Sequence, residues 1–167
     1  MNAPIQTPRL ILKPMDDRDS QMVQAILTHS AVTSTYMVPD LTPAQADTLF
    51  QRFKALSADP ARFVRGIYLN EELIGFLNDT EIEGDSMELG WALHPLYHNQ
   101  GYATEAVRAA ISHLLAHGFT QIIAGAFEEN NPSIRVMEKC GMPKMKKIDF
   151  IDYRGKNHRC VYYSFSK

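Results

Sequence analysis

The sequence predicts an α+β protein of three layers, in which a mixed and mostly antiparallel sheet of about seven strands carries helices on both faces. One observation is the set of short segments with apolar runs or period-two alternation, typical of strands: 9–13, 63–69, 73–78, 87–93, 121–127, 148–153 and 159–165. A second is the three- and four-residue apolar spacing between them, typical of helices with one buried face. The third is their order, which is one strand, two helices, three antiparallel strands, helix, strand, helix and a terminal hairpin.

The first part of the chain reads as a strand followed by two helices. Residues 9–13 alternate as a strand that Pro14 ends, and the apolar spacing at 23–27 predicts a first helix behind a cluster of acids. Residues 33–39 are expected to be irregular. Thr42-Pro43 is an N-cap and first-turn pair for a second helix. We expect the two helices and their linker to form a rim over one end of the sheet.

Three antiparallel strands follow. The turn at 70–72 joins the strands at 63–69 and 73–78, and a second turn at 83–85 leads into a half-buried strand at 87–93.

A single glycine-centred turn then connects that strand to a helix. Pro95 stops the strand, and apolar residues recur with helical spacing from Ala103 to Leu115, with Gly118 as the expected C-cap. The turn between them is His98-Asn99-Gln100-Gly101-Tyr102-Ala103-Thr104-Glu105. Free N–H groups and the helix dipole favour an anion at such a helix start, although a short glycine connection is also a common structural feature. Neither Gly-x-Gly-x-x-Gly nor the Gly-x-x-x-x-Gly-Lys-Ser/Thr motif occurs in the chain.

A second strand–helix unit lies directly behind the first. Its strand runs to about Phe127, and its helix is two to three turns long, with Asn131 as the expected N-cap, Pro132 at the first helical position and Gly141 at C′. A terminal hairpin around residues 154–157 completes the chain. We see no repeat, linker or low-complexity tract and expect a single domain over residues 1–167.

Composition and charge exclude several classes of protein. The chain of 167 residues is 45% hydrophobic, with 17 basic against 19 acidic residues and a net charge of -2. It therefore lacks a basic footprint for nucleic acid. No leader and no apolar window of about 18 residues is present, so we expect a cytoplasmic protein without a membrane partner. Cys140 and Cys160 form no Cys-x-x-Cys pair and are expected as reduced, packed thiols.

Together, the two strand–helix units resemble the core of the Gcn5-related N-acetyltransferase (GNAT) family. That family's pyrophosphate loop reads Arg/Gln-x-x-Gly-x-Gly/Ala, which this chain matches at Gly101 and Ala103 but not at His98. The flank Gly101-Tyr102-Ala103-Thr104-Glu105-Ala106, the pattern Asn130-x-x-Ser133-x-Arg135 and the opening Thr7-Pro8-Arg9-Leu10 are similar to the ribosomal-protein N-acetyltransferase (RimJ/RimL-like) branch. The resemblance implies the GNAT fold, with its fourth and fifth strands splayed apart to admit the pantetheine arm.

The resemblance also implies acetyl-coenzyme A (acetyl-CoA) as cosubstrate and a primary amine, on a small molecule or a protein N-terminus, as acceptor. Loop backbone would face the pyrophosphate, and the end of the 87–93 strand would face pantetheine. The residues implied in cofactor binding are Ala92, Leu93, His98, Asn99, Gln100, Gly101, Tyr102, Ala103, Thr104, Asn130 and Ser133. A monomer and a homodimer both stay open.

Two residues are the candidates for catalysis. Glu88 lies on the strand that would carry the thioester and could act as general base, directly or through water, although a polar strand face can also be simply solvated. Ser133 could contact the thiol region, and it could equally cap a helix. The last helix offers no tyrosine as proton donor to the leaving sulfur.

Other polar and aromatic residues carry weaker hypotheses. Asp79, Glu81 and Glu83 are weaker candidates for the base, while His94 and His98 are expected to have structural roles. His113 and His117 lack a third ligand, so we expect no metal. The aromatic candidates for an acceptor pocket are Tyr36, Trp91, Phe127, Tyr153 and Tyr163, and the acids that could attract an amine are Asp40, Glu128 and Glu129.

These features leave three functional hypotheses. The first is an acetyl-CoA-dependent N-acetyltransferase that works by direct attack in a ternary complex. The alternative is a non-catalytic acyl-CoA-binding or regulatory module, suggested by the departure at His98 and the absent tyrosine. An interaction domain with no cofactor is a third reading.

Overall fold

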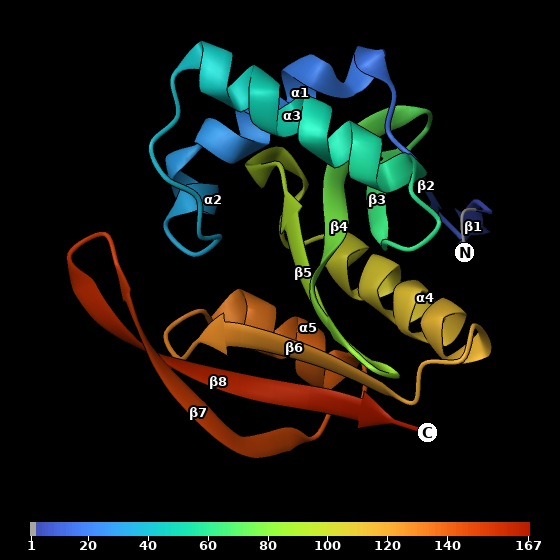
Figure 1. The fold of residues 1–167 in the computed structure, drawn as a ribbon, viewed down its shortest axis with the longest axis vertical. Coiled ribbons are helices and arrows are strands. Elements are labelled where there is room, and N and C mark those ends of the chain that lie inside the picture. Colours follow the sequence, from blue (N-terminus) through green and yellow to red (C-terminus); the bar gives the residue numbers. More distant parts are fainter. Residues whose placement is uncertain (1–2) are drawn as a thin grey trace.

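A computed structural model describes residues 3–167 as one open sheet of eight strands in the order β1-β2-β3-β4-β5-β6-β8-β7 (Figure 1). All neighbouring strands are antiparallel except β5 and β6. The strands are β1 (Ile5–Gln6), β2 (Leu10–Lys13), β3 (Val64–Leu69), β4 (Glu72–Glu83), β5 (Ser86–Leu93), β6 (Gln121–Phe127), β7 (Lys144–Tyr153) and β8 (Lys156–Ser166). The helices are α1 (Ser20–Thr28), α2 (Ser30–Thr33), α3 (Pro43–Ala58), α4 (Tyr102–Ala116) and α5 (Asn131–Lys139), with short 3-10 turns η1 (Asp17–Asp19) and η2 (Pro95–Tyr97).

The predicted α+β class and the order of the main elements are confirmed. The structure differs from the prediction in having two additional short elements, β1 and α2, and in the greater length of β4 and β7. The eighth strand is β1, where Ile5 pairs with Leu12; two residues are too few to show alternation. Strands β4 and β7 are longer than expected because their polar halves pair in the sheet while facing solvent. The short α2 immediately precedes the irregular segment, and the N-cap of α3 at Thr42 is confirmed.

Two apolar cores lie on opposite faces of the sheet. Val64 and Phe76 pack with α1 and α3 on one face, whereas Ile67 and Leu77 pack with α4 on the other. This alternation along β3 and β4 follows from the period-two geometry of strands. The predicted helices on both faces are therefore confirmed, and Figure 1 shows α1 and α3 together on one side.

Strands β5 and β6 are splayed, as the resemblance implied. They pair in parallel only from Ser86–Glu88 to Gln121–Ile123. Beyond Glu88, β5 pairs with β4 alone, and the carboxyl ends of β5 and β6 separate (Figure 1). The gap between them lies beside the starts of α4 and α5.

The ends of α4 and α5 differ slightly from the prediction. The N-cap of α5 is Asn130 and not Asn131: the Asn130 side chain accepts the Ser133 N–H, which makes Asn131 the first helical residue. Both asparagines suit a cap, and only the path of the chain out of β6 decides between them. Gly118 follows the C-cap of α4 at φ +100°, and Gly141 has φ +76°. In the part of the chain that is described, no helix is long and apolar enough to cross a membrane.

Candidate active site

Two adjoining cavities open at the splay. The first cavity, of about 510 Å³, lies between the end of β5, the turn into α4 and the start of α5. The second cavity, of about 330 Å³, lies between β4, β5, β6 and the segment after α2. Five residues line both cavities, so the two meet there: Thr35, Tyr36, Trp91, Asn130 and Ser133. Volumes of this order are typical of small-molecule sites.

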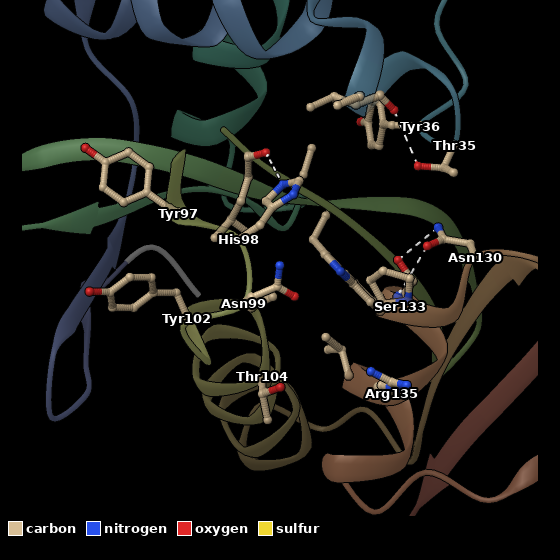
Figure 2. Close-up of a pocket in the computed structure, with 18 of the residues that line it drawn as sticks. Thr35, Tyr36, Tyr97, His98, Asn99, Tyr102, Thr104, Asn130, Ser133 and Arg135 are labelled. Carbon is tan, nitrogen blue, oxygen red and sulfur yellow. Dashed lines mark hydrogen bonds between the residues drawn. The ribbon is translucent and has the colours of Figure 1, made fainter. Parts of the chain in front are cut away.

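The residues predicted for cofactor binding come together in the first cavity (Figure 2). Those that line it are Ala92, Leu93, His98, Asn99, Gly101, Tyr102, Ala103, Thr104, Asn130 and Ser133. Gln100 does not line it, because its side chain is exposed and donates to the Leu96 carbonyl at 3.0 Å. Most of the predicted set therefore shares one surface.

The first cavity has the electrostatics of an anion site. Helix α4 begins at Gly101, which has φ +81° and provides no side-chain cap for the first-turn N–H groups. The positive end of a 15-residue helix thus faces the cavity. Arg135 and Lys139 of α5 line the same cavity. These two cations were not predicted, although their spacing of four along one helix could have suggested a shared face.

His98, which departs from the loop motif of the family, has a structural role in the turn. Its Nε2 lies 2.9 Å from the Leu93 carbonyl oxygen. Since a carbonyl only accepts, Nε2 carries the proton and donates to the end of β5. The imidazole therefore ties the turn after η2 to the strand that borders the cavity.

A network from the N-terminal segment holds the start of α4 from outside the cavity. The Glu105 carboxylate accepts from the Thr7 hydroxyl at 2.6 Å and from the Arg9 backbone N–H at 2.8 Å, and it pairs with Arg9 Nε at 2.7 Å. Arg9 also donates to the Gln100 carbonyl at 2.9 Å and stacks over the Tyr102 ring. This network was not predicted, because its partners are almost 100 residues apart in the sequence.

Glu88 lines the second cavity at the last position where β5 still pairs with β6. Burial raises the pKa of the half-buried Glu88 carboxyl, while a hydrogen bond with Thr80 and the charge of Lys147 act in the opposite direction. The sheet register shifts between Asp79 and Glu81, which places Thr80 in a bulge beside Glu88. Glu88 is thus a half-buried carboxylate that faces the cavity, which is the position a general base would need.

The other acid candidates differ from Glu88 in position. Asp79 is buried and paired with Arg62 through two contacts of 2.7 and 2.8 Å, so its carboxylate is part of the scaffold. Glu81 and Glu83 are exposed on the far half of β4 and line neither cavity.

Ser133 and Asn130 form a reciprocal pair where the two cavities meet. The Asn130 Oδ1 accepts the Ser133 N–H at 3.3 Å, and its Nδ2 donates to the Ser133 Oγ at 3.1 Å (Figure 2). The Ser133 hydroxyl proton stays available to a group in the cavity, because the hydroxyl accepts from the amide. Asn130, rather than Ser133, has the capping role.

The tip of the β7–β8 hairpin reaches over to the segment that roofs the second cavity. The Tyr153 hydroxyl donates to the Thr33 carbonyl and lies 3.1 Å from the Val38 carbonyl. Arg154 pairs with Asp40 at 2.7 Å. Of the aromatic candidates, Tyr36 and Trp91 line the cavities, whereas Phe127, Tyr153 and Tyr163 line neither.

His113 and His117, at the end of α4, contact each other and the backbone of the helix. The rings of His113 and His117 lie 4.0 Å apart, and the His117 Nδ1 interacts with the His113 carbonyl at 2.8 Å. Over residues 3–167, no group of three potential metal ligands was found.

The splay between β5 and β6 thus has a helix start beside the first cavity and the Glu88 carboxylate in the second, and comparison with known families gives the class of protein. The chain belongs to the GNAT acetyltransferases: the family model described as "Acetyltransferase (GNAT) domain" matches residues 9–143.

Several similar proteins are described as acetyltransferases. An uncharacterized N-acetyltransferase of Bacillus subtilis, YnaD, is 32% identical over 146 residues, which cover 83% of this chain and 81% of that protein. Among solved structures, a GNAT acetyltransferase from Bacillus anthracis has a TM-score of 0.85 at 24% identity and covers 98% of both chains. RimL, a ribosomal L7/L12 alpha-N-protein acetyltransferase solved with coenzyme A, has a TM-score of 0.86 at 17% identity and covers 98% of both chains. The last two show that the fold is shared.

Proposed function

We propose that this enzyme transfers an acetyl group from acetyl-CoA to a primary amine, by direct attack in a ternary complex within one catalytic domain. The observation that supports this most is the junction of the two cavities at Ser133 and Asn130. One cavity has a helix start and two cations that suit a phosphate ligand, and the other holds a half-buried carboxylate. A reaction at the junction would be reached by one substrate from each side.

The residues of the first cavity fit acetyl-CoA. The pyrophosphate would lie against the N–H groups of Gly101 to Thr104, with Arg135 and Lys139 nearby. The pantetheine arm would lie along the backbone of Ala92 and Leu93, and Asn130 would hold it from α5. Acetyl-CoA supplies the activated thioester carbonyl carbon. Loop backbone is the main binding element here, so histidine at position 98 is compatible with binding.

Glu88 and Ser133 are the proposed catalytic residues. An amine must be neutral to attack, and a lysine-like amine with a pKa of about 10.4 costs roughly 4 to 5 kcal/mol to deprotonate at pH 7. A carboxylate whose pKa is raised by burial can take that proton, directly or through water. The Ser133 hydroxyl, held by Asn130, would donate a hydrogen bond to the departing thiolate, which would take its proton from water. An α-amine, with a pKa of about 8, needs the base less.

The acceptor is proposed at the coarser level of a primary amine. RimL and a Salmonella typhimurium structure described as modifying the N-terminal serine of a ribosomal protein share the fold, and they make a protein N-terminus a reasonable acceptor. A small amine fits the same chemistry.

Calorimetry with acetyl-CoA, combined with a thiol-release assay over a panel of amines, tests the proposal. We expect binding and amine-dependent release of coenzyme A. Gly101→Asp should weaken acetyl-CoA binding by at least about tenfold, because Gly101 has φ +81° and an added Cβ would meet the Arg9 guanidinium at 3.3 Å, so the turn that presents the N–H groups must shift. Gly84→Asp is the matched control, since Gly84 also has positive φ but lies in open space at an exposed turn. Binding without turnover of any amine would instead identify a non-catalytic acyl-CoA-binding module, and unchanged affinity in Gly101→Asp would exclude the proposed loop.

A further inference from the structure

Charge is divided between the two cavities. Arg135, Lys139 and Glu129 line the first cavity, and the Glu129 carboxylate is already paired with Lys156 and His158. Among the described residues that line the second cavity, Glu88 is the only one with a carboxylate, and none is a lysine, arginine or histidine. The first cavity therefore favours an anionic ligand, and the second favours a cationic or neutral one.

The rest of the second cavity is polar but neutral. The Tyr36 hydroxyl donates to the Asn78 Oδ1 at 3.0 Å, and the Asn78 Nδ2 donates to the Asp79 carbonyl at 3.2 Å. The Thr80 hydroxyl donates to the Glu88 carbonyl at 3.3 Å. These groups can exchange hydrogen bonds with a neutral ligand but cannot neutralise a carboxylate.

The charged groups outside the lining do not reverse this balance. Lys147 on β7 interacts electrostatically with Glu88, as do the acids Glu81 and Asp149. Lys147 itself lies 3.8 Å from the Asp149 carboxylate and 4.3 Å from the centroid of the Tyr162 ring. Its charge is thus already shared with a neighbouring acid.

This charge distribution discriminates between two kinds of amine. In a free amino acid, the carboxylate is attached to the carbon that carries the amine, so both groups must enter the cavity together. Its negative charge would then lie near the half-buried Glu88 with no cation in the lining to pair with it. Burial of a charge without a partner is unfavourable, and a like charge nearby adds to the cost. An amide in the same place is neutral and can use the polar lining.

We propose that the acceptor is a primary amine with no carboxylate on the neighbouring carbon, the class that includes peptide N-termini and amino acid amides, and that the cation-free second cavity with Glu88 excludes free amino acids. This inference rests on the proposed acetyl transfer to an amine. It adds a rule of specificity that depends on charge.

Matched acceptor pairs test the rule. Alaninamide is compared with alanine, and serinamide with serine. Each kcat/KM is calculated for the neutral form of the amine, so that differences in amine pKa do not affect the comparison. We expect at least about a tenfold preference for each amide. Calorimetry in the presence of coenzyme A should show binding of alaninamide but not of alanine, which is a readout independent of turnover.

A cation added to the second cavity should relax the rule. Met37 lines this cavity and is 52% exposed, so Met37→Arg can be accommodated and brings a guanidinium to the mouth. We expect the amide preference to fall by about tenfold, through a higher kcat/KM for alanine. Ile82→Arg is the control: Ile82 is also exposed but lines neither cavity, and its variant should keep the wild-type preference. Glu88→Gln should lower the preference as well, although its overall rate falls.

The outcomes separate this rule from the proposed function. If alanine and alaninamide are acetylated equally well, the rule is overturned while acetyl transfer stands. If Met37→Arg binds acetyl-CoA normally but leaves the preference unchanged, the electrostatic origin of the rule is wrong. If no amine of any kind is acetylated, the proposed function fails first.

Discussion

At the scale of single residues, the site depends on where a few polar side chains lie relative to the splay. Glu88 occupies the last position at which β5 pairs with β6 and lines the second cavity, whereas Asp79 on the adjacent strand is paired with Arg62. Both acids belong to one short stretch of sheet, and only burial and partners separate a candidate base from a scaffold residue. His98 is a second case, because its Nε2 supports the end of β5.

The raised pKa of Glu88 leads to a prediction about the pH dependence of kcat/KM. The base acts only when it is deprotonated, so activity should be lost as the pH falls through a Glu88 pKa that burial holds above 4.5. With alaninamide as acceptor, the amine and Glu88 both lose a proton in this range, and log kcat/KM should rise with slope two at the lowest pH and slope one above it. In Glu88→Gln, the slope should be one throughout. A slope of two that persists in the variant would assign the second proton to another group.

At the scale of elements, the start of α5 combines a structural and a functional role. Asn130 caps the helix through the Ser133 N–H and at the same time orients the Ser133 hydroxyl where the cavities meet. An N-cap residue that also lines a cavity joins helix stability to site geometry.

The position of this cap can be tested by urea unfolding. Asn130→Ala should lower the free energy of unfolding by about 1 kcal/mol, because it removes a side-chain N-cap. Asn131→Ala serves as the matched variant and should change stability by no more than about 0.5 kcal/mol, since alanine is favourable at the first helical position. A larger loss of unfolding free energy in Asn131→Ala than in Asn130→Ala would instead identify Asn131 as the cap.

At the scale of the whole molecule, the C-terminal hairpin holds a segment that lines the second cavity. Its tip holds the segment after α2 through Tyr153 and the Arg154–Asp40 ion pair, more than 100 residues away in the sequence. That segment contributes Thr35, Tyr36 and Met37 to the second cavity. The hairpin therefore supports this cavity from outside, because its own residues do not line it.

Release of the hairpin tip should affect the acceptor more than the cofactor. Arg154→Ala removes the contacts with Asp40 and the Val38 carbonyl, and we expect the KM for the amine to rise about three- to tenfold with an unchanged acetyl-CoA affinity. Steady-state kinetics and calorimetry separate the two effects. Arg159→Ala is the control. Arg159 lies on the same hairpin and also forms an ion pair, with Glu128 after β6, but it lines neither cavity. Equal changes in both variants would point to general loosening of the hairpin.

The fold and the cofactor side could be predicted from the sequence because their signals are local. The turn at Gly101, the caps near Gly118 and Gly141 and the alternation of the strands each depend on residues within a few positions of one another. The resemblance to the GNAT family joined these local signals into one fold, and the match over residues 9–143 confirms it.

Only the tertiary structure decided how distant residues meet. The Arg9–Glu105 network, the cations Arg135 and Lys139 in the first cavity and the hairpin tip over the second cavity left no periodic signal, because each depends on the twist and order of the sheet. The same holds for the charge of the second cavity, which follows from which side chains the splay leaves facing inward. By itself, the sequence thus determined the elements and the glycine turn before α4, whereas the packing of β4, β5, β6 and the segment after α2 determined the space and charge of the second cavity.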